Sequence, residues 1–167
     1  MTDASSSEVR MEIKGLMLDP TSNVPIVILR DAASQLLLPI WIGVFEANAI
    51  ALRLEGVETL RPMTHDLLRS TLEQLGATVR KIVICDLKES TFFALIHVAV
   101  RDQELAIDSR PSDAIALALR SDAPIYALRH VLEKARAIDL AGDPSDEERL
   151  KKWLEEIGPE DLGKYTM

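Results

Sequence analysis

The run Ala49-Ile50-Ala51-Leu52 recurs 65 residues later as Ala114-Ile115-Ala116-Leu117, and this repetition decides the fold. Ile42 falls on Ile107 at the same offset. Before each run come two apolar segments with strand-like alternation, separated by a short polar turn. Each half of the chain therefore predicts a hairpin followed by a buried helix.

A further strand precedes each hairpin. The predicted strands are 9–18, 25–30 and 35–42 in the first half, and 78–87, 91–100 and 104–107 in the second. The sequence thus predicts two copies of a β-β-β-α unit, over residues 9–55 and 78–121, which form one mixed sheet packed with helices. The helices around Ala49 and Ala114 are apolar on nearly all sides, so we expect a second layer, which could be another subunit, to cover them. The fold class is α+β.

Shorter elements connect and follow the two copies. Residues 64–75 carry apolar side chains at helical spacing, and Gly76 is placed to end that helix. Residues 124–128 predict a short strand, and residues 131–137 predict a short helix. Residues 141–144 read as a linker.

Chain length favours a single domain with extensions at both ends, because 167 residues is close to the usual size of one domain. We expect a flexible N-terminus over residues 1–8, the domain over residues 9–140, and an acidic helical tail over residues 141–167. Ser145 and Glu148 form a capping box, and an apolar stripe follows on one helical face: Leu150, Trp153, Leu154 and Ile157. The stripe favours docking on the domain or on a sister subunit over a separate partner.

Composition and charge narrow the classes of function. The net charge of -8 argues against an extended nucleic-acid surface, although several arginines could line a local basic cleft: Arg53, Arg61, Arg69, Arg110 and Arg120. The only cysteine is Cys85, so the chain has no intramolecular disulfide and a reducing compartment fits best. The N-terminus lacks the features of an export signal, and no apolar run is long enough to span a membrane. We expect a cytoplasmic protein that does not bind membranes.

Polar residues concentrate in four otherwise apolar regions, and three of these regions open a predicted helix. They are 45–46, 61–66, 86–90 and 108–113. A helix start favours anions such as phosphate, because its backbone N–H groups and its dipole point at the ligand. We therefore expect the functional site at these helix starts.

The segment from Asp108 to Asp113 is the richest of the four. Its two carboxylates and the guanidinium of Arg110 suit metal binding and the orientation of a phosphate. Helix capping is the alternative, with Ser109 as N-cap and Pro111 in the first turn. Capping does not explain Arg110, since a cation near a helix start opposes the dipole unless an anion meets it.

A histidine and three further acids complete the candidate set. His65 and Asp66 follow Thr64, a natural N-cap, so His65 can be a general base, a metal ligand or a structural residue. Glu46 and Glu89 are the remaining acids, and each alone is more readily explained by capping or solvation. His97 and His130 are interpreted as bystanders. The chain has no Gly-rich phosphate loop, nucleophile elbow, zinc-protease motif or dinucleotide fingerprint.

Four longer strings resemble the bifunctional nuclease domain family, over about residues 9–137. They are Leu38-Pro39-Ile40-Trp41-Ile42-Gly43, Arg61-Pro62-Met63-Thr64-His65-Asp66-Leu67-Leu68, Glu89-Ser90-Thr91-Phe92-Phe93-Ala94 and Ile107-Asp108-Ser109-Arg110-Pro111-Ser112-Asp113-Ala114-Ile115-Ala116. The resemblance implies an α+β fold with a duplicated unit, assembly as a homo-oligomer, and cleavage of both DNA and RNA. Some members carry a C-terminal repair-protein-like interaction motif, in place of which this chain has its acidic helix.

Two functions remain open at this point. The first is a nuclease that hydrolyses phosphodiester bonds of DNA and RNA with a divalent metal, Mg or Mn. Its catalytic residues are expected to be His65, Asp66, Glu89, Asp108, Arg110 and Asp113, with the metal held by Asp66, Glu89, Asp108 and Asp113. The second is a non-catalytic regulatory module that binds a small anionic ligand or a protein partner. A purely structural oligomer subunit, whose polar motifs are all caps, is a third possibility.

Overall fold

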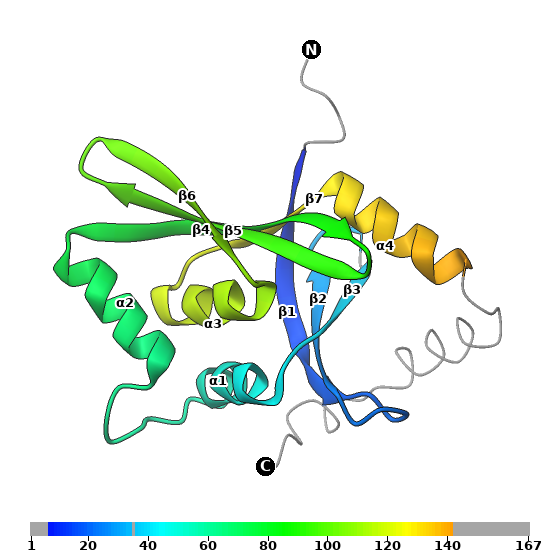
Figure 1. The fold of residues 1–167 in the computed structure, drawn as a ribbon, viewed down its shortest axis with the longest axis horizontal. Coiled ribbons are helices and arrows are strands. Elements are labelled where there is room, and N and C mark those ends of the chain that lie inside the picture. The colour runs from blue at the N-terminus through cyan, green and yellow to red at the C-terminus, as the bar shows by residue number, and fades with distance from the viewer. Residues whose placement is uncertain (1–6, 35, 142–167) are drawn as a thin grey trace.

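The predicted strands form one seven-stranded mixed sheet in the computed structural model, which describes residues 7–34 and 36–141. The strand order is β3-β2-β1-β7-β4-β5-β6 (Figure 1). The strands are β1 (Glu8–Leu18), β2 (Pro25–Asp31), β3 (Leu37–Trp41), β4 (Ala77–Lys88), β5 (Thr91–Val100), β6 (Gln103–Ser109) and β7 (Ile125–Leu128). The α+β class is thereby confirmed.

The duplication predicted from the repeat is confirmed by the sheet order. In each unit the first strand pairs antiparallel with the second and the second with the third, and a helix follows: α1 (Val44–Leu54) in one unit and α3 (Pro111–Ser121) in the other. Strand β7 lies between the units, antiparallel to β1 and parallel to β4. Strands β1 and β4 therefore run in opposite directions, and the two units extend outward from β7.

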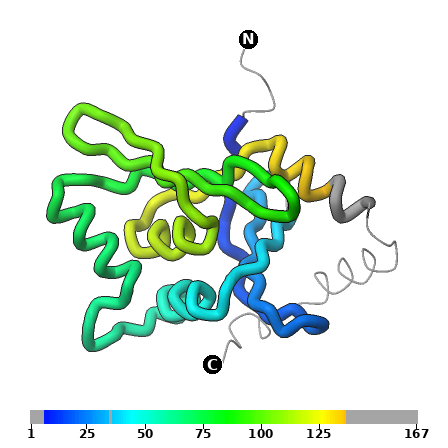
Figure 2. The backbone as a smooth tube through the Cα atoms, in the orientation of Figure 1, coloured from blue at the N-terminus to red at the C-terminus, as the bar shows by residue number. Residues whose placement is uncertain are grey.

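Three helices gather on one side of β4, β5 and β6 (Figures 1 and 2). Helices α1 and α3 pack against each other, and α2 (Thr64–Gln74) packs against α3 and β4. Ile50 and Ile115 of the repeated run are fully buried in the main core. The second layer expected over α3 is supplied by α1 and α2. Helix α4 (Arg129–Ala141) packs against β4 and β7, beside the start of β1 (Figure 1).

Helix boundaries differ from the predictions at two starts. The N-cap of α3 is Arg110 and not Ser109, because Pro111, whose φ is fixed and which has no N–H, takes the first helical position. The N-cap of α2 is Met63 and not Thr64.

The observed bounds agree with the prediction better at the end of α2 than at the ends of α4. Helix α2 stops just before Gly76, which adopts a positive φ of 74° that suits glycine. Helix α4 extends beyond the predicted residues 131–137 at both ends, and it includes Ala141, which was interpreted as the start of a linker.

Both ends of the chain reach beyond the described residues. The predicted tail helix and its apolar stripe lie outside the described residues. Glu8, which was assigned to the flexible N-terminus, is the first residue of β1. Within residues 7–34 and 36–141, no helix is long and apolar enough to cross a membrane.

Candidate active site at three helix starts

Four polar side chains from the first turns of α1, α2 and α3 meet in one ion-paired group, here named the helix-start cluster: Glu46, His65, Arg110 and Asp113. Arg110 donates from Nε to Asp113 Oδ2 at 2.7 Å and from Nη2 to Glu46 Oε1 at 2.8 Å. His65 Nε2 lies 2.9 Å from Asp113 Oδ1. Asp113 thus links the guanidinium of Arg110 to the imidazole of His65. The cation at the α3 start, which capping left unexplained, is balanced by two carboxylates.

A second ion pair, the Arg120 clamp, ties the same three helices together. The Arg120 side chain is only 3% exposed and donates from Nε to Asp66 Oδ1 at 2.6 Å. Its two Nη groups donate to the carbonyl oxygens of Ala116, at 2.9 Å, and Ala49, at 3.0 Å. Asp66 Oδ2 accepts the Met63 N–H at 2.9 Å. Since Asp66 follows His65 directly, the clamp fixes the turn that carries the histidine.

The ion pairs set the protonation of the acids. Burial opposes the ionisation of Asp113, but hydrogen bonds from Arg110 and His65 outweigh it, so the pKa of Asp113 lies below its ordinary value. Burial also opposes the ionisation of Asp66, and the bonds from the Met63 N–H and Arg120 likewise lower its pKa. The hydrogen bonds to Asp113 and Glu46 raise the pKa of Arg110. The two aspartates are therefore carboxylates at neutral pH.

The charge on Asp113 decides which ring nitrogen of a neutral His65 carries the proton. An ionised carboxylate only accepts hydrogen bonds, so the imidazole Nε2 must carry the proton in the 2.9 Å contact. Nδ1 is then the nitrogen with a free lone pair, and no residue in the described part of the chain bonds to it. The side chain is 10% exposed, so few waters reach it. A buried histidine oriented by a carboxylate is an arrangement used for general base catalysis.

Two predicted site residues lie outside both the helix-start cluster and the Arg120 clamp. Glu89 is exposed in the turn between β4 and β5, with a positive φ of 47°. Asp108 lies on β6 in register with Leu95, and its charge helps, after burial and together with Asp86, to raise the pKa of the Cys85 thiol on β4. Neither acid is hydrogen-bonded or ion-paired to the helix-start cluster. The structure therefore gathers His65, Asp66, Arg110 and Asp113, adds Glu46, and leaves Glu89 and Asp108 apart.

The predicted metal ligands do not come together in the described residues. Within residues 7–34 and 36–141, no three His, Cys, Asp or Glu side chains are grouped so that they could hold a metal ion. The carboxylates of Glu46, Asp66 and Asp113 each already accept a hydrogen bond from an arginine. As arranged, these acids do not fit a metal centre, because their oxygens are committed to guanidinium groups.

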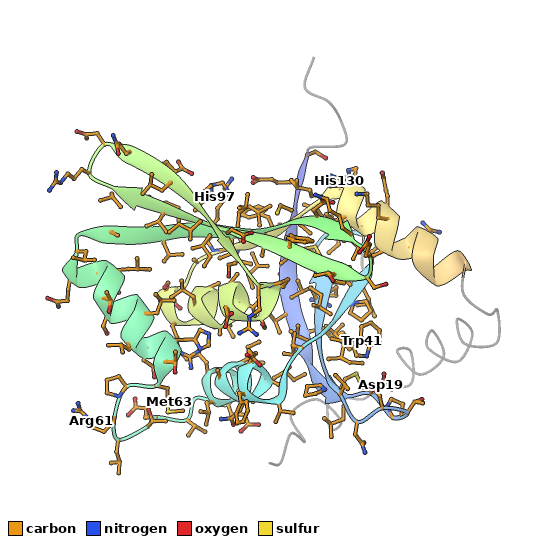
Figure 3. The ribbon with its side chains drawn as sticks, viewed as in Figure 1. Asp19, Trp41, Arg61, Met63, His97 and His130 are labelled. Atoms are coloured by element: carbon orange, nitrogen blue, oxygen red, sulfur yellow. The ribbon has the colours of Figure 1, made fainter. Side chains whose placement is uncertain are left out.

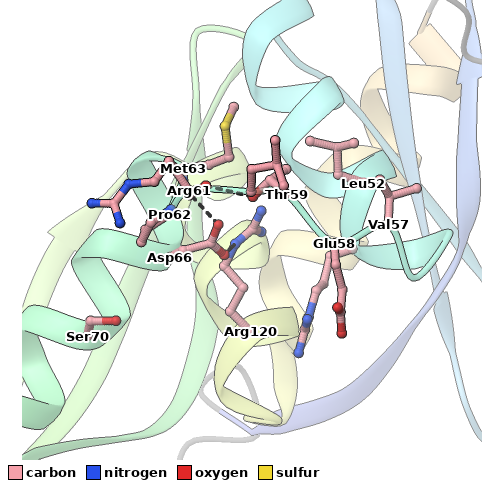
Figure 4. Close-up of a pocket in the computed structure, with 12 residues that line it drawn as sticks. Leu52, Val57, Glu58, Thr59, Arg61, Pro62, Met63, Asp66, Ser70 and Arg120 are labelled. Carbon is pink, nitrogen blue, oxygen red and sulfur yellow. Dashed lines mark hydrogen bonds and ion pairs between the residues drawn. The ribbon is translucent and has the colours of Figure 1, made fainter.

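A pocket of about 300 Å³ lies between Asp66 and the loop that connects α1 and α2 (Figure 4). Asp66 and Arg120 meet at its floor, and Thr59 Oγ1 donates to the Arg61 carbonyl oxygen at 2.7 Å, which orders the loop. We name this the α1–α2 pocket, lined by Leu52, Arg53, Val57, Glu58, Thr59, Leu60, Arg61, Pro62, Met63, Asp66, Ser70 and Arg120.

The other two histidines lie away from the loop that carries Arg61 and Met63 (Figure 3). His97 Nδ1 is 3.3 Å from Glu104 Oε1, and His130 Nε2 is 3.8 Å from Asp86 Oδ1. Sequence reasoning assigned Arg120 only to a general basic cleft and missed its role as a clamp. The available signal was an arginine inside an otherwise apolar, buried helix.

Comparison with known sequences identifies the family of the chain. A family profile described as "Bifunctional nuclease domain" matches residues 27–139. An uncharacterized protein of Mycobacterium tuberculosis (strain ATCC 25618 / H37Rv) is 39% identical over 166 residues, which cover 93% of this chain and 97% of that protein.

Two plant proteins match at lower identity. Bifunctional nuclease 1 of Oryza sativa subsp. japonica is 25% identical over 68% of this chain, and bifunctional nuclease 2 of Arabidopsis thaliana is 26% identical over 64%. The matched parts are 35% and 33% of those proteins, so the chain spans about a third of their length. Given the profile match and the mycobacterial relative, the chain belongs to the bifunctional nuclease domain family.

Proposed function

We propose that this protein is a nuclease that hydrolyses phosphodiester bonds of DNA and RNA at the helix-start cluster. The observation that carries the proposal is the His65–Asp113–Arg110 chain of contacts, with distances of 2.9 and 2.7 Å, in a member of a nuclease family. In this proposal the proton acceptor, His65, and the phosphate-binding cation, Arg110, share one carboxylate. Residues from three different helix starts supply the helix-start cluster, which capping alone does not require.

His65 acts as the general base in this proposal. A water molecule attacks phosphorus while Nδ1 of His65 accepts its proton, and the charge of Asp113 stabilises the imidazolium that forms. The new P–O bond forms as the bond to the departing sugar oxygen breaks, and that oxygen takes a proton from solvent. The Arg120 clamp holds Asp66, and with it the turn that positions His65, so little reorganisation is needed.

Arg110 binds the phosphate that is attacked. Its side chain is 64% exposed, and its bonds to Asp113 and Glu46 use Nε and one hydrogen of Nη2. Of the five N–H donors of a guanidinium, three remain for phosphate oxygens. The charge that develops on the phosphate in the transition state is then met by a cation already held in place.

The test compares purified parent, His65→Ala and Arg110→Ala proteins on single-stranded DNA, double-stranded DNA and RNA. Loss of a base or of a phosphate-binding group should lower the cleavage rate by roughly a hundredfold. Each substrate is assayed with magnesium, with manganese and with chelator, which measures metal dependence directly. Thermal unfolding of each variant verifies that it is folded.

Matched controls come from the same chain. His97→Ala removes a histidine from β5, and Asp108→Asn and Glu89→Gln remove the acids outside the cluster, so all three should cleave at close to the parental rate. If folded His65→Ala and Arg110→Ala cleave as fast as the parent, the activity belongs to a trace contaminant and the nuclease proposal fails. A drop confined to Asp108→Asn and Glu89→Gln would move the site to β6 and to the turn between β4 and β5.

We also propose that the protein assembles as a homo-oligomer. Large apolar side chains are well exposed on α1, on α2 and at the end of α2, with Phe45 83%, Leu67 60% and Leu75 73% exposed. Exposed apolar surface of this kind favours association. Light scattering after size exclusion should give a mass above that of one chain, and Phe45→Ser should lower the stability of the assembly.

A further inference from the structure

The α1–α2 pocket has an excess of positive charge in a chain whose net charge is -8. Arg120 and Asp66 neutralise each other at 2.6 Å, which leaves Arg53 and Arg61 against the single acid Glu58. Arg53 is exposed, and its one side-chain hydrogen bond is a long contact of 3.5 Å from Nε to the Leu119 carbonyl oxygen. Arg61 lies at the rim with its guanidinium directed outward (Figure 4). Both arginines can therefore take up an anion from solvent.

The rest of the pocket lining combines two hydroxyl side chains, Thr59 and Ser70, with apolar ones. The apolar side chains are Leu52, Val57, Leu60, Pro62 and Met63. A volume of about 300 Å³ is at the lower end of small-molecule sites, where apolar walls supply contact area and a few polar groups fix orientation. Cationic groups beside an apolar wall match a ligand with a phosphate at one end and a flat, weakly polar ring at the other.

Asp66 connects this pocket to the helix-start cluster. It lines the pocket, receives the Arg120 bond and directly follows His65 in the first turn of α2. A ligand in the pocket therefore contacts the residue that directly follows His65 in the first turn of α2.

From these observations we infer that the α1–α2 pocket binds one nucleotide unit of the nucleic acid, with its phosphate on Arg53 and Arg61 and its base against Val57 and the neighbouring apolar wall. The inference rests on the proposed nuclease function and adds a subsite to it. The nucleotide held there neighbours the bond attacked at His65, so the pocket sets where the strand is cut.

The test is calorimetric titration of the whole protein with three probes in the presence of chelator: adenosine 5′-monophosphate, adenosine and inorganic phosphate. The monophosphate should bind more tightly than either part alone. Arg53→Ala and Arg61→Ala should each weaken monophosphate and phosphate binding by about tenfold, as the loss of a charge-assisted hydrogen bond implies. Val57→Ser should weaken binding of the monophosphate and of adenosine, and leave that of phosphate unchanged.

Arg80→Ala is the matched control, because it removes the same charge from an exposed position on β4 outside the pocket. If Arg80→Ala weakens binding as much as Arg61→Ala, the attraction is general to the surface and the inference fails. It also fails if the monophosphate binds no better than phosphate. A parent that cleaves RNA but binds no monophosphate overturns the subsite alone, whereas a parent that binds the monophosphate but cleaves nothing overturns the nuclease proposal alone.

Discussion

The two β-β-β-α units have the same strand order, yet their helices begin and end with different chemistry. Helix α1 begins after Gly43 with a single acid, Glu46, whereas α3 begins with Arg110 as N-cap and Asp113 in its first turn. Each helix has an arginine one residue before its last residue. Arg53 of α1 is exposed beside a pocket, while Arg120 of α3 is buried with three partners. Duplication thus supplies a symmetric frame, and the substitutions at helix ends supply an asymmetric site.

The largest expected effect on the free energy of unfolding comes from the buried isoleucines that the two units share. Ile50 and Ile115 occupy the same place in the repeated run and are both fully buried, so Ile50→Ala and Ile115→Ala should each lower the free energy of unfolding by about 4 kcal/mol. Urea denaturation at neutral pH measures both. Values that differ by more than about 2 kcal/mol would break the idea that the two units contribute equally.

Arg53 and Arg120 occupy equivalent positions at the ends of α1 and α3, but they should contribute differently to stability. Arg120→Ala removes a buried cation that holds three helices, and we expect a loss of about 3 kcal/mol in the free energy of unfolding. Arg53→Ala removes an exposed side chain and should cost at most ~0.5 kcal/mol. Equal losses from the two variants in urea titrations would show that the buried clamp is not special.

Lowering the pH should destabilise the fold, because it protonates Asp66 and Asp113. The pKa values of Asp66 and Asp113 are lowered in the folded protein, so both carboxylates stabilise the fold above their unfolded pKa near 3.9. That stabilisation is lost as the pH falls below about 4 and through the folded values. Urea midpoints at pH 6 and pH 3 should therefore differ less for Asp113→Asn than for the parent.

The smallest expected effect concerns the α1 start. A Cβ atom at Gly43 would meet the end of the Glu46 side chain, which can swing away. Gly43→Ala should therefore change the free energy of unfolding by ~0.5 kcal/mol or less, while it displaces Glu46 from the exposed ion pair with Arg110. A crystal structure of the variant and its urea midpoint measure the two effects. A loss of several kcal/mol would mean that the glycine is needed by the backbone.

The two β-β-β-α units could be predicted from the sequence because local periodicity identifies strands and helices. Strand alternation and the repeated helix run identified both units, and Gly76 marked the end of α2. The segment 124–128 was predicted as a strand, but nothing in its four or five residues shows that β7 lies at the centre of the sheet. Neighbour relations in a sheet depend on long-range pairing, which local patterns do not encode.

The site was predictable only in part for a similar reason. Side chains predicted at helix starts do come together, since His65 and Arg110 both contact Asp113 and Asp66 contacts Arg120. Asp108 was included because it is close in sequence to Arg110, but it belongs to the preceding strand, where its side chain influences Cys85 on β4. Sequence proximity across a strand–helix junction does not bring side chains into one site.

The central position of β7 also bears on how the protein is made. A chain emerging from the ribosome can form β1, β2 and β3 early and β4, β5 and β6 later, because both sets pair within themselves. In the seven-stranded sheet the two sets are hydrogen-bonded to each other only through β7, which is synthesised after both. Until residue 128 has left the ribosome, β1 and β4 each expose an unpaired edge, the kind of edge on which strands of other chains add. The nascent protein is therefore most prone to aggregation just before β7 appears.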